Sequence, residues 1–522
     1  MSELAYQGKQ KINGKTYVYQ AIAMWDKNKK HSKQKRIYIG HEDESGNFIP
    51  NKNYRQSNTP NPDEVVQSSL PSIITTKDYG DVHLLRHIAA ETGLSSVLEA
   101  VFPNCHNDIF GCAMHLVINN SALHLCKQWA ESAWNIDETK LSSQRISELL
   151  QVLDENSQLN FYRQWASLRQ EREYLAFDIT SISSYSELIE QVERGYNRDK
   201  EDLPQINLAM LFGEETKLPV FCRTYPGSIR DVSTLTNMVK FINTINMERM
   251  HLVMDKGFYS DKGVASLLEK RTKFSVGVPF TTSLAKDAVS AVRQEINNPT
   301  NAIAAGNDII YASTSVVPLH SRRAYIHVFF DEKRHISKRT DFIQKILYTE
   351  NGLRNGTIKK DHPLAKKYLK LRNSKNGLNI TRDTVAIEAH LATAGFFVIL
   401  SNDSKDPQYV LNVYRSKDVV EKSFENLKNE LDLDRLHVHS DKAMQGRIFI
   451  GFIALILASF IRNIMQKHSL YKNFTFSSLL AEMKKLKIVV FKGTKTALTE
   501  YTHKQKAILK AFQIPVQIHS SI

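Results

Sequence analysis

Cysteine is scarce in this chain: four cysteines occur among 522 residues, at positions 105, 112, 126 and 222. So few thiols exclude the disulfide framework of a small secreted protein, and cytoplasmic thiols normally stay reduced. Cys105, His106, Cys112 and His115 lie close together in an apolar stretch, but they lack the paired ligand spacing of zinc fingers. We therefore interpret the cysteines as buried free thiols in preference to a structural zinc site.

Segments that direct a chain to or across a membrane are also lacking. The first ten residues, MSELAYQGKQ, show no basic start, apolar middle or small-residue cleavage site of a secretory signal. The apolar run over residues 448–461 is bounded by Arg447 and Arg462 and is shorter than the about 20 residues that span a bilayer. We expect this run to be a buried core helix, and the protein to be cytoplasmic with no membrane partner.

Positive charge, by contrast, is in excess. The chain has 69 Lys and Arg against 55 Asp and Glu, which gives a formal net charge of +14 and a pI near 9.3. This balance favours a polyanionic partner such as nucleic acid, although many basic proteins bind none. The content of 42% hydrophobic and 24% charged residues is that of a globular protein, and the length predicts several domains.

Residues 1–60 are expected to form a basic, β-rich region. Two β-prone runs, YVYQAIAMW and RIYIG, flank a segment that carries six Lys or Arg between Lys27 and Arg36. The pattern predicts a hairpin. Its tip fits a solvated turn as well as a finger that contacts phosphates.

Residues 61–169 are predicted to be a helical, DNA-binding module. Apolar residues recur at helical spacing before Gly93, which ends the run, and Ser95 or Ser96 is expected to cap the next helix. A third helix is predicted to begin near Ser142. Such short helices fit a helix-turn-helix DNA reader as well as a plain helical bundle.

Residues 170–283 show an α/β pattern and are expected to form the first part of the core. Three strand-like runs are followed by a helix expected over residues 231–245, the strand MHLVMD, the helix DKGVASLLEKR and the strand KFSVGVPF. This order predicts an α/β fold with a mixed sheet. Residues 284–400 break the rhythm and are interpreted as an insertion, after which the core resumes over residues 401–470. Residues 471–522 are expected to form a basic, mostly helical C-terminal region.

Two aspartates follow buried strand runs: Asp178 comes after YLAF and Asp255 after HLVM. Neighbouring strands of one sheet would bring the two carboxylates within metal-bridging distance. A carboxylate in such a place is costly unless it is paired or coordinates a cation. Aspartates at strand ends are common, however, so either one taken alone fits a structural role.

A predicted helix from Tyr414 onward carries a third acid on a distinctive face. With about 100° of rotation per residue, the apolar side chains at 420, 424, 427 and 431 form a core-facing stripe. Beside that stripe, within about 60° of each other, lie Lys417, Lys428, Glu421 and Tyr414. The simpler alternative is a salt bridge between Lys417 and Glu421, since such i,i+4 pairs stabilise helices by a few tenths of a kcal/mol.

At these residues the sequence resembles the DDE transposases of bacterial insertion sequences. Their signature on the last catalytic helix is Tyr, two residues, Arg, three residues, Glu, six residues, Lys. Tyr414, Glu421 and Lys428 match this spacing, and Lys417 stands where arginine is usual. The segments LAFDITSIS, PGSIRD and LVMDKGFYSDKG extend the resemblance over most of residues 170–465.

The resemblance implies a ribonuclease H-like core interrupted by a β-rich insertion. It also implies a transposase that performs cut-and-paste transposition by hydrolysis and strand transfer at the ends of the element. Asp178, Asp255 and Glu421 would bind two Mg²⁺ or Mn²⁺ ions, hard cations that prefer oxygen ligands. The implied partners are double-stranded DNA, as terminal inverted repeats and target, and a second copy of the chain in a synaptic dimer. Such a protein is expected at the nucleoid.

Six residues are expected to contact the DNA backbone without reading its sequence. The resemblance implies the first three, and proximity to the motifs indicates the others: Tyr414, Lys417, Lys428, Arg230, Lys256 and Tyr259. Lysine at position 417 offers a point charge where arginine would grip a phosphate through two hydrogen bonds.

Some relatives stack a flipped base on a tryptophan of the insertion. The tryptophans of this chain, at positions 25, 129, 134 and 165, all lie outside it. Tyr311, Tyr325, Phe329 or another aromatic residue would have to serve.

Two other functions stay open. A different ribonuclease H-like two-metal nuclease, such as a resolvase, would lack specific binding to repeated DNA ends. A non-catalytic DNA-binding relative would be expected to have lost at least one of the three acids, and this chain keeps all three.

Overall fold

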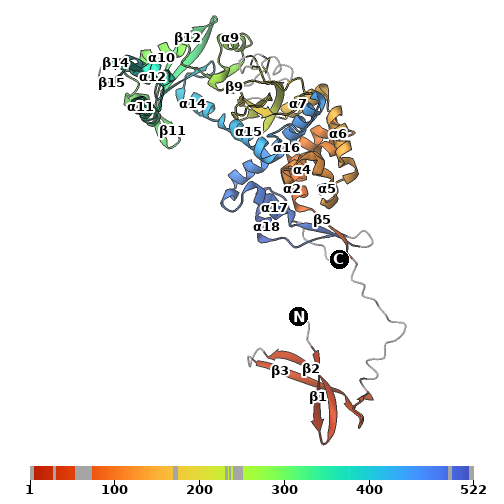
Figure 1. Ribbon diagram of the computed structural model, residues 1–522. Helices are drawn as coiled ribbons and strands as arrows, with labels where there is room; N and C mark the ends of the chain where they lie inside the picture. The colour runs from red at the N-terminus through yellow and green to blue at the C-terminus, as the bar shows by residue number, and fades with distance from the viewer. Residues whose placement is uncertain are drawn as a thin grey trace. The chain divides into compact units, whose positions relative to one another are not determined.

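The computed structural model of the chain describes residues 5–26, 31–52, 54, 73–168, 174–229, 233, 235, 237–238, 251–374, 377–491 and 496–516. It consists of two compact units, Met1–Ser72 and Ile73–Ile522. Figure 1 shows the elements of both units.

The first unit is a four-stranded antiparallel sheet in the order β1-β2-β3-β4. Its strands are β1 (Ala5–Ile12), β2 (Lys15–Asp26), β3 (His31–Glu42) and β4 (Phe48–Pro50). The predicted hairpin of β2 and β3 is confirmed, and pairing continues to Asp26 and His31; the tip, residues 27–30, lies outside the described residues. Asn13 and Gly14 have φ of 47° and 82°, which suits the tight β1–β2 turn that an Asn-Gly pair favours.

A nine-stranded sheet forms the centre of the second unit, in the order β11-β12-β13-β16-β10-β9-β6-β7-β8. The five core strands are β6 (Tyr174–Ser183), β7 (Gln205–Gly213), β8 (Pro219–Pro226), β9 (His251–Met254) and β10 (Lys273–Gly277). β6, β7 and β8 are antiparallel neighbours, whereas β9 runs parallel to both β6 and β10. This is the mixed, ribonuclease H-like arrangement that the sequence predicts.

The core strands are covered on their faces, which explains their unbroken apolar runs. All nine residues of β7 are buried, as expected when neither face meets water. The predicted helix between the parallel strands β9 and β10 is α9 (Asp261–Glu269), which Ser260 caps. The helix expected over residues 231–245 falls mostly outside the described residues.

Helices form a bundle around the apolar helix α16 (Asp441–Lys467), which contacts α4, α6, α2, α15 and β8. The helices between residues 80 and 167 are α2 (Gly80–Glu91), α3 (Leu94–Val101), α4 (His106–Asn119), α5 (Cys126–Ser132), α6 (Ser143–Val152) and α7 (Glu155–Ser167). By length and composition α16 is apolar enough to cross a membrane, but 78% of its most apolar window is buried inside the protein. The predicted core helix is therefore confirmed.

One predicted helix cap is wrong. Gly93, at φ 77°, both follows α2 and stands at the N-cap of α3, so the helix begins directly after the left-handed residue. The hydroxyl of Ser95 instead donates to the carbonyl oxygen of Ala89 at 3.2 Å. The predicted start of α6 is confirmed, since Ser142 accepts a hydrogen bond from the amide of Arg145.

The C-terminal region joins this helical body through an unexpected sheet. β5 (Ile73–Asp78), β17 (Lys487–Phe491) and β18 (Thr496–Leu498) form it in the order β18-β17-β5. The predicted C-terminal helices are α17 (Phe476–Lys484), which packs on α2, and α18 (His503–Ala511). Segments about 400 residues apart are thus paired, which no local sequence pattern reveals.

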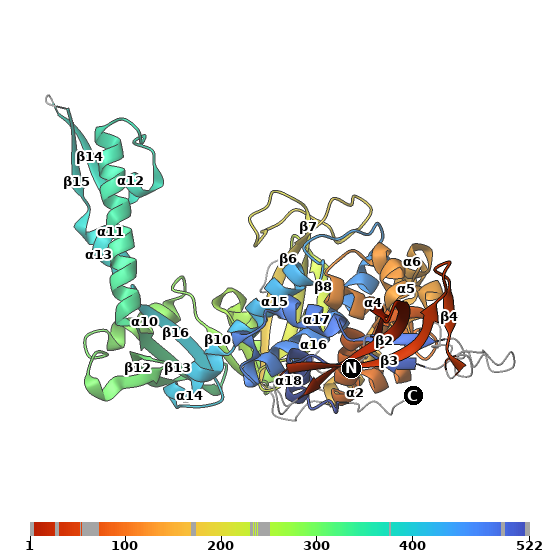
Figure 2. The same cartoon turned by 90° about the horizontal axis from the view of Figure 1, so that it is seen from below.

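The insertion extends the central sheet. β16 (Phe396–Ser401) pairs with β10 on one side and with β13 on the other. The other elements are α10 (Ser283–Val292), β11 (Ala302–Ala305), β12 (Asp308–Leu319), β13 (Arg322–Phe330), α11 (Glu332–Arg354), α12 (Pro363–Tyr368), β14 (Leu369–Ser374), β15 (Gly377–Arg382) and α13 (Thr384–Leu391). Figure 2 shows α11 leading from the sheet to the β14–β15 hairpin. This 23-residue helix is not expected from the sequence.

A buried acid makes the second unit sensitive to pH. Asp81, in the first turn of α2, is fully buried, and its Oδ2 has no hydrogen-bond partner among the described residues. Burial raises its pKa to about 6. Because the folded pKa exceeds the unfolded one, stability falls as the pH rises from about 4 to about 6, and the penalty then stays constant.

We therefore expect Asp81→Asn to stabilise the protein above pH 6, by at most about 3 kcal/mol for the shift of about two pKa units. Denaturant unfolding of both proteins between pH 4 and pH 8 measures this difference. The gain should grow up to about pH 6 and then level off. A loss of stability that does not change with pH would show that the carboxylate is not a source of strain.

Candidate active site

The two candidate aspartates lie on neighbouring strands of the central sheet. Asp178 lies in the middle of β6, and Asp255 directly follows β9. In the parallel register of these strands Phe177 is opposite Met254, so the residue after each of them is one of the two acids. The prediction that neighbouring strands carry the two acids is confirmed, and the metal-bridging distance stays a prediction.

The surroundings of the two aspartates differ. Asp178 is partly buried; burial raises its pKa to about 6, while Arg198 and Lys417 lower it and Glu421 raises it further. Burial also acts to raise the pKa of Asp255, but Lys417 and the hydroxyl of Tyr414 outweigh it and hold that pKa below its usual value. Positive charge therefore compensates Asp255 more fully than it compensates Asp178.

Glu421 lies on α15 (Asp418–Glu430). This helix packs on β6, the strand that carries Asp178, and on β7. The predicted apolar stripe is confirmed, since the side chains at 420, 424, 427 and 431 are all buried. Glu421 itself is 59% exposed, and its Oε1 accepts a hydrogen bond from Lys417 Nζ at 3.1 Å. The simple i,i+4 salt bridge is thus present, but the same ammonium also lies 3.4 Å from Asp255 Oδ1.

The expectation of one continuous helix from Tyr414 is wrong. α14 (Pro407–Arg415) ends before Ser416, and Lys417 is the N-cap of α15. The hydroxyl of Ser416 donates to the carbonyl of Val413, a local bond of the kind that competes with helix continuation. Tyr414 therefore approaches from a separate helix and donates to Asp255 Oδ1 at 2.9 Å.

A glycine that has no signature in the sequence makes room for this hydrogen bond. A Cβ at Gly277 of β10 would lie 2.7 Å from the Tyr414 hydroxyl and 3.0 Å from the Lys256 amide. Either contact is closer than ordinary van der Waals distance. Gly277 thus belongs to the site by its lack of a side chain.

The remaining predicted DNA contacts are placed differently. Lys256 is exposed beside Asp255. Lys428 forms an ion pair with Asp199 at 2.5 Å and is 13% exposed. The Tyr259 hydroxyl donates to Asp261 at 3.0 Å. Arg230 lies outside the described residues.

The aromatic residues considered for base stacking are not equally accessible. Phe329 is fully buried and stacks on Phe397, with ring centroids 4.9 Å apart. It cannot receive a base without unpacking the sheet, so this candidate is wrong. Tyr311 and Tyr325 are partly buried on β12 and β13.

The described part of the chain holds one group of side chains close enough together to share a metal ion. Ligand atoms of Asp432, Asp434 and His437 all lie within 4.8 Å of one another. Asp432, however, forms an ion pair with the buried guanidinium of Arg447 at 2.9 Å, so its negative charge is already neutralised within the protein. The three candidate catalytic acids do not meet this distance condition together.

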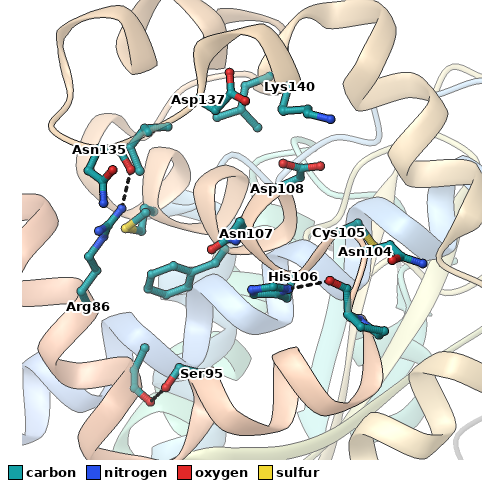
Figure 3. Close-up of a pocket in the computed structure, with 16 residues that line it drawn as sticks. Arg86, Ser95, Asn104, Cys105, His106, Asn107, Asp108, Asn135, Asp137 and Lys140 are labelled. Atoms are coloured by element: carbon teal, nitrogen blue, oxygen red, sulfur yellow. Dashed lines mark hydrogen bonds between the residues drawn. The ribbon is translucent and has the colours of Figure 1, made fainter.

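A hollow of about 660 Å³ in the helical body lies apart from these acids. Figure 3 shows Cys105, His106 and Asp108 in its lining. His106 is hydrogen bonded to the carbonyl of Pro103. Cys112 is buried, and His115 contacts the carbonyl of Ala122. Of the four residues considered for zinc, Cys105 and His106 thus line the hollow, whereas Cys112 and His115 do not.

Comparison with known proteins identifies the family of the chain. A family model of the transposase DDE domain matches residues 169–457. No curated protein was found to match the chain. Among solved structures, a piggyBac transposase synaptic complex with hairpin DNA is similar over 78% of this chain and 76% of its own, with 10% identity and a TM-score of 0.32. That likeness is too low to support any inference. The family match covers more than half of the chain, which therefore belongs to the family of transposases with a DDE domain.

Proposed function

We propose that this chain catalyses cut-and-paste transposition of a bacterial insertion sequence, with Asp178, Asp255 and Glu421 as ligands of two Mg²⁺ or Mn²⁺ ions. The strongest support is the register of β6 and β9, in which Phe177 is opposite Met254, so that Asp178 and Asp255 follow at adjacent positions. Lys417 links Glu421 to the same place by its contacts with two of the acids.

The donor set suits hard divalent cations. Three carboxylates offer only oxygen atoms, which Mg²⁺ prefers. The raised pKa of Asp178, which burial causes, shows a carboxylate whose negative charge is incompletely compensated. When bound, two such cations would activate a water or a 3′-hydroxyl for attack and stabilise the departing 3′ oxygen.

The chain's own residues hold the acids and offer charge to DNA. Tyr414 fixes Asp255 through its hydroxyl. Lys417 neutralises Asp255 and Glu421 and would gain a further anionic partner in a DNA phosphate. Lys256 is exposed for a backbone contact, whereas Lys428 would first have to leave Asp199.

We further propose that the DNA partners are the terminal inverted repeats and the target, and that two copies act together at the nucleoid. Cutting both ends of an element in a concerted way requires two active sites. The net charge of +14 supports an anionic partner.

Metal removal tests the proposal. The full chain should cleave a labelled duplex from the DNA flanking its own gene in the presence of Mg²⁺ or Mn²⁺. Excess EDTA should stop cleavage, and restored Mg²⁺ should recover it, because the carboxylates alone cannot activate water. Cleavage that persists in EDTA would contradict the metal mechanism. Cleavage without preference for repeated ends would favour another ribonuclease H-like nuclease, and binding without cleavage would favour a non-catalytic relative.

A further inference from the structure

A hollow of about 670 Å³ lies in the insertion, between α10 and the elements α11, α12 and α13. Buried Phe342 and Tyr368 are part of its lining. Four exposed lysines surround it: Lys286 from α10, Lys338 and Lys345 from α11, and Lys367 from α12. We name these four residues the lysine rim.

Salt bridges do not neutralise the lysine rim: within the residues that the structure describes, none of the four lysines has an ion-pair partner. Lys367 Nζ lies 5.3 Å from the ring centroid of Tyr368. Nearby lysines of the insertion do: Lys333 pairs with Asp308, and Lys370 pairs with Asp383 at 3.0 Å. Asp341 is the acid in the lining of the hollow. The excess of positive charge raises the local concentration of anions.

The charges of the rim act on one another and on their surroundings. Burial lowers the pKa of Lys338, and the nearby charges of Arg334 and Lys256 lower it further. Burial likewise lowers the pKa of His390, with further lowering by Lys367 and Lys338. Lys338 is thus close enough to Arg334 and Lys256 for their positive charges to act on it.

The geometry of α11 connects the rim with the candidate active site. Arg334, Lys338 and Lys345 are spaced by four and seven residues, so they share one face of the helix. They span about 17 Å along its axis at about 1.5 Å per residue. The guanidinium of Arg334 lies 5.7 Å from the ring centroid of Phe397, and Phe397 and Tyr414 pack against the same apolar cluster. One end of the basic face thus lies near the cluster that holds Tyr414.

We propose that the lysine rim binds the phosphodiester backbone of the duplex DNA that the three acids cut. This inference rests on the proposed function. Duplex DNA rises about 3.4 Å per base pair, so about 17 Å of helix matches about five base pairs. A single phosphate group cannot span this distance, whereas a DNA backbone can. Contacts of this kind position DNA without reading its sequence.

Salt-dependent binding tests the lysine rim. The full chain would be titrated with a fluorescein-labelled duplex of about 40 base pairs of arbitrary sequence. We expect Lys338→Gln/Lys345→Gln/Lys367→Gln to bind about tenfold more weakly than the parent. The slope of log K against log salt concentration should fall by about 0.9 for each phosphate that the variant no longer neutralises. The control Lys333→Gln/Lys370→Gln removes two lysines that are already paired and should bind within about twofold of the parent.

Two further measurements keep the proposal falsifiable. Replacing the same three lysines with arginine should retain affinity, because the charge remains. In the parent chain, DNA should protect the rim lysines from acylation, as read by mass spectrometry, more than it protects Lys333. Unchanged affinity and slope in the Gln variant, or rim lysines that DNA leaves unprotected, would overturn the proposal. If the parent binds and cuts DNA in those cases, only the lysine rim is refuted; a parent that binds no DNA refutes the proposed function itself.

Discussion

Glu421→Gln is expected to lower the single-turnover rate of DNA cleavage by at least about 10³-fold, while the affinity for DNA stays within about twofold. Metal ions contribute several kcal/mol to a phosphoryl-transfer barrier, and each 1.4 kcal/mol corresponds to about a tenfold change in rate. Glutamine keeps the size of the side chain and removes the charge that holds a cation. Glu421 is 59% exposed, so the fold should tolerate the change.

Glu425→Gln is the matched control for this experiment. Glu425 is exposed one turn further along the same helix, α15, and we place it outside the site. It should retain cleavage at nearly the parent rate. Equal cleavage by the parent and Glu421→Gln would refute the role of Glu421, and loss in the Glu425 variant alone would transfer that role to Glu425.

Phe449→Ala is expected to destabilise the second unit by about 3–5 kcal/mol. Phe449 of α16 is fully buried. Its ring centroid lies 5.4 Å from that of Phe102 and 5.1 Å from that of Phe161. Tyr162 belongs to the same cluster, and its ring centroid lies 4.7 Å from that of Phe221 of β8. Removing the ring leaves a cavity where the helical body meets the sheet.

Thermal unfolding followed by circular dichroism measures this effect, with an expected drop in Tm of roughly 5 °C or more. Phe449→Leu fills part of the cavity and should lose less stability. Tyr471→Ala, at a side chain that is 47% exposed, should change Tm little. A Tm for Phe449→Ala equal to that of the parent would show that the cluster does not hold the bundle to the sheet.

The acids were predictable because each carries a local signal. Asp178 and Asp255 each follow a largely buried apolar run of four residues, and a strand order of the ribonuclease H type makes these two runs parallel neighbours. The stripe that begins at Val420 fixes which face of α15 is buried, and Glu421 follows beside it. Periodicity therefore sufficed for the parts of the site that depend on one element at a time.

Features that depend on contacts distant in sequence were not predictable. Helical periodicity continues across Ser416, although the chain breaks there to let Tyr414 reach Asp255. Gly277 matters only because the Tyr414 hydroxyl comes close to it in space. The helix α11 is charged and keeps Ile336 and Tyr348 exposed, so its apolar pattern is weak.

The break between α14 and α15 puts Lys417 at the junction of two helices. α14 packs on β9, β10, β11 and β12, and thus touches both the core and the insertion, whereas α15 packs on β6, β7 and α16. Ser416 and Lys417 belong to neither helix. A displacement of the insertion would therefore reach the core through these two residues as well as through the pairing of β16 with β10. Since Lys417 contacts Asp255 and Glu421 together, a shift of Lys417 would act on both acids at once.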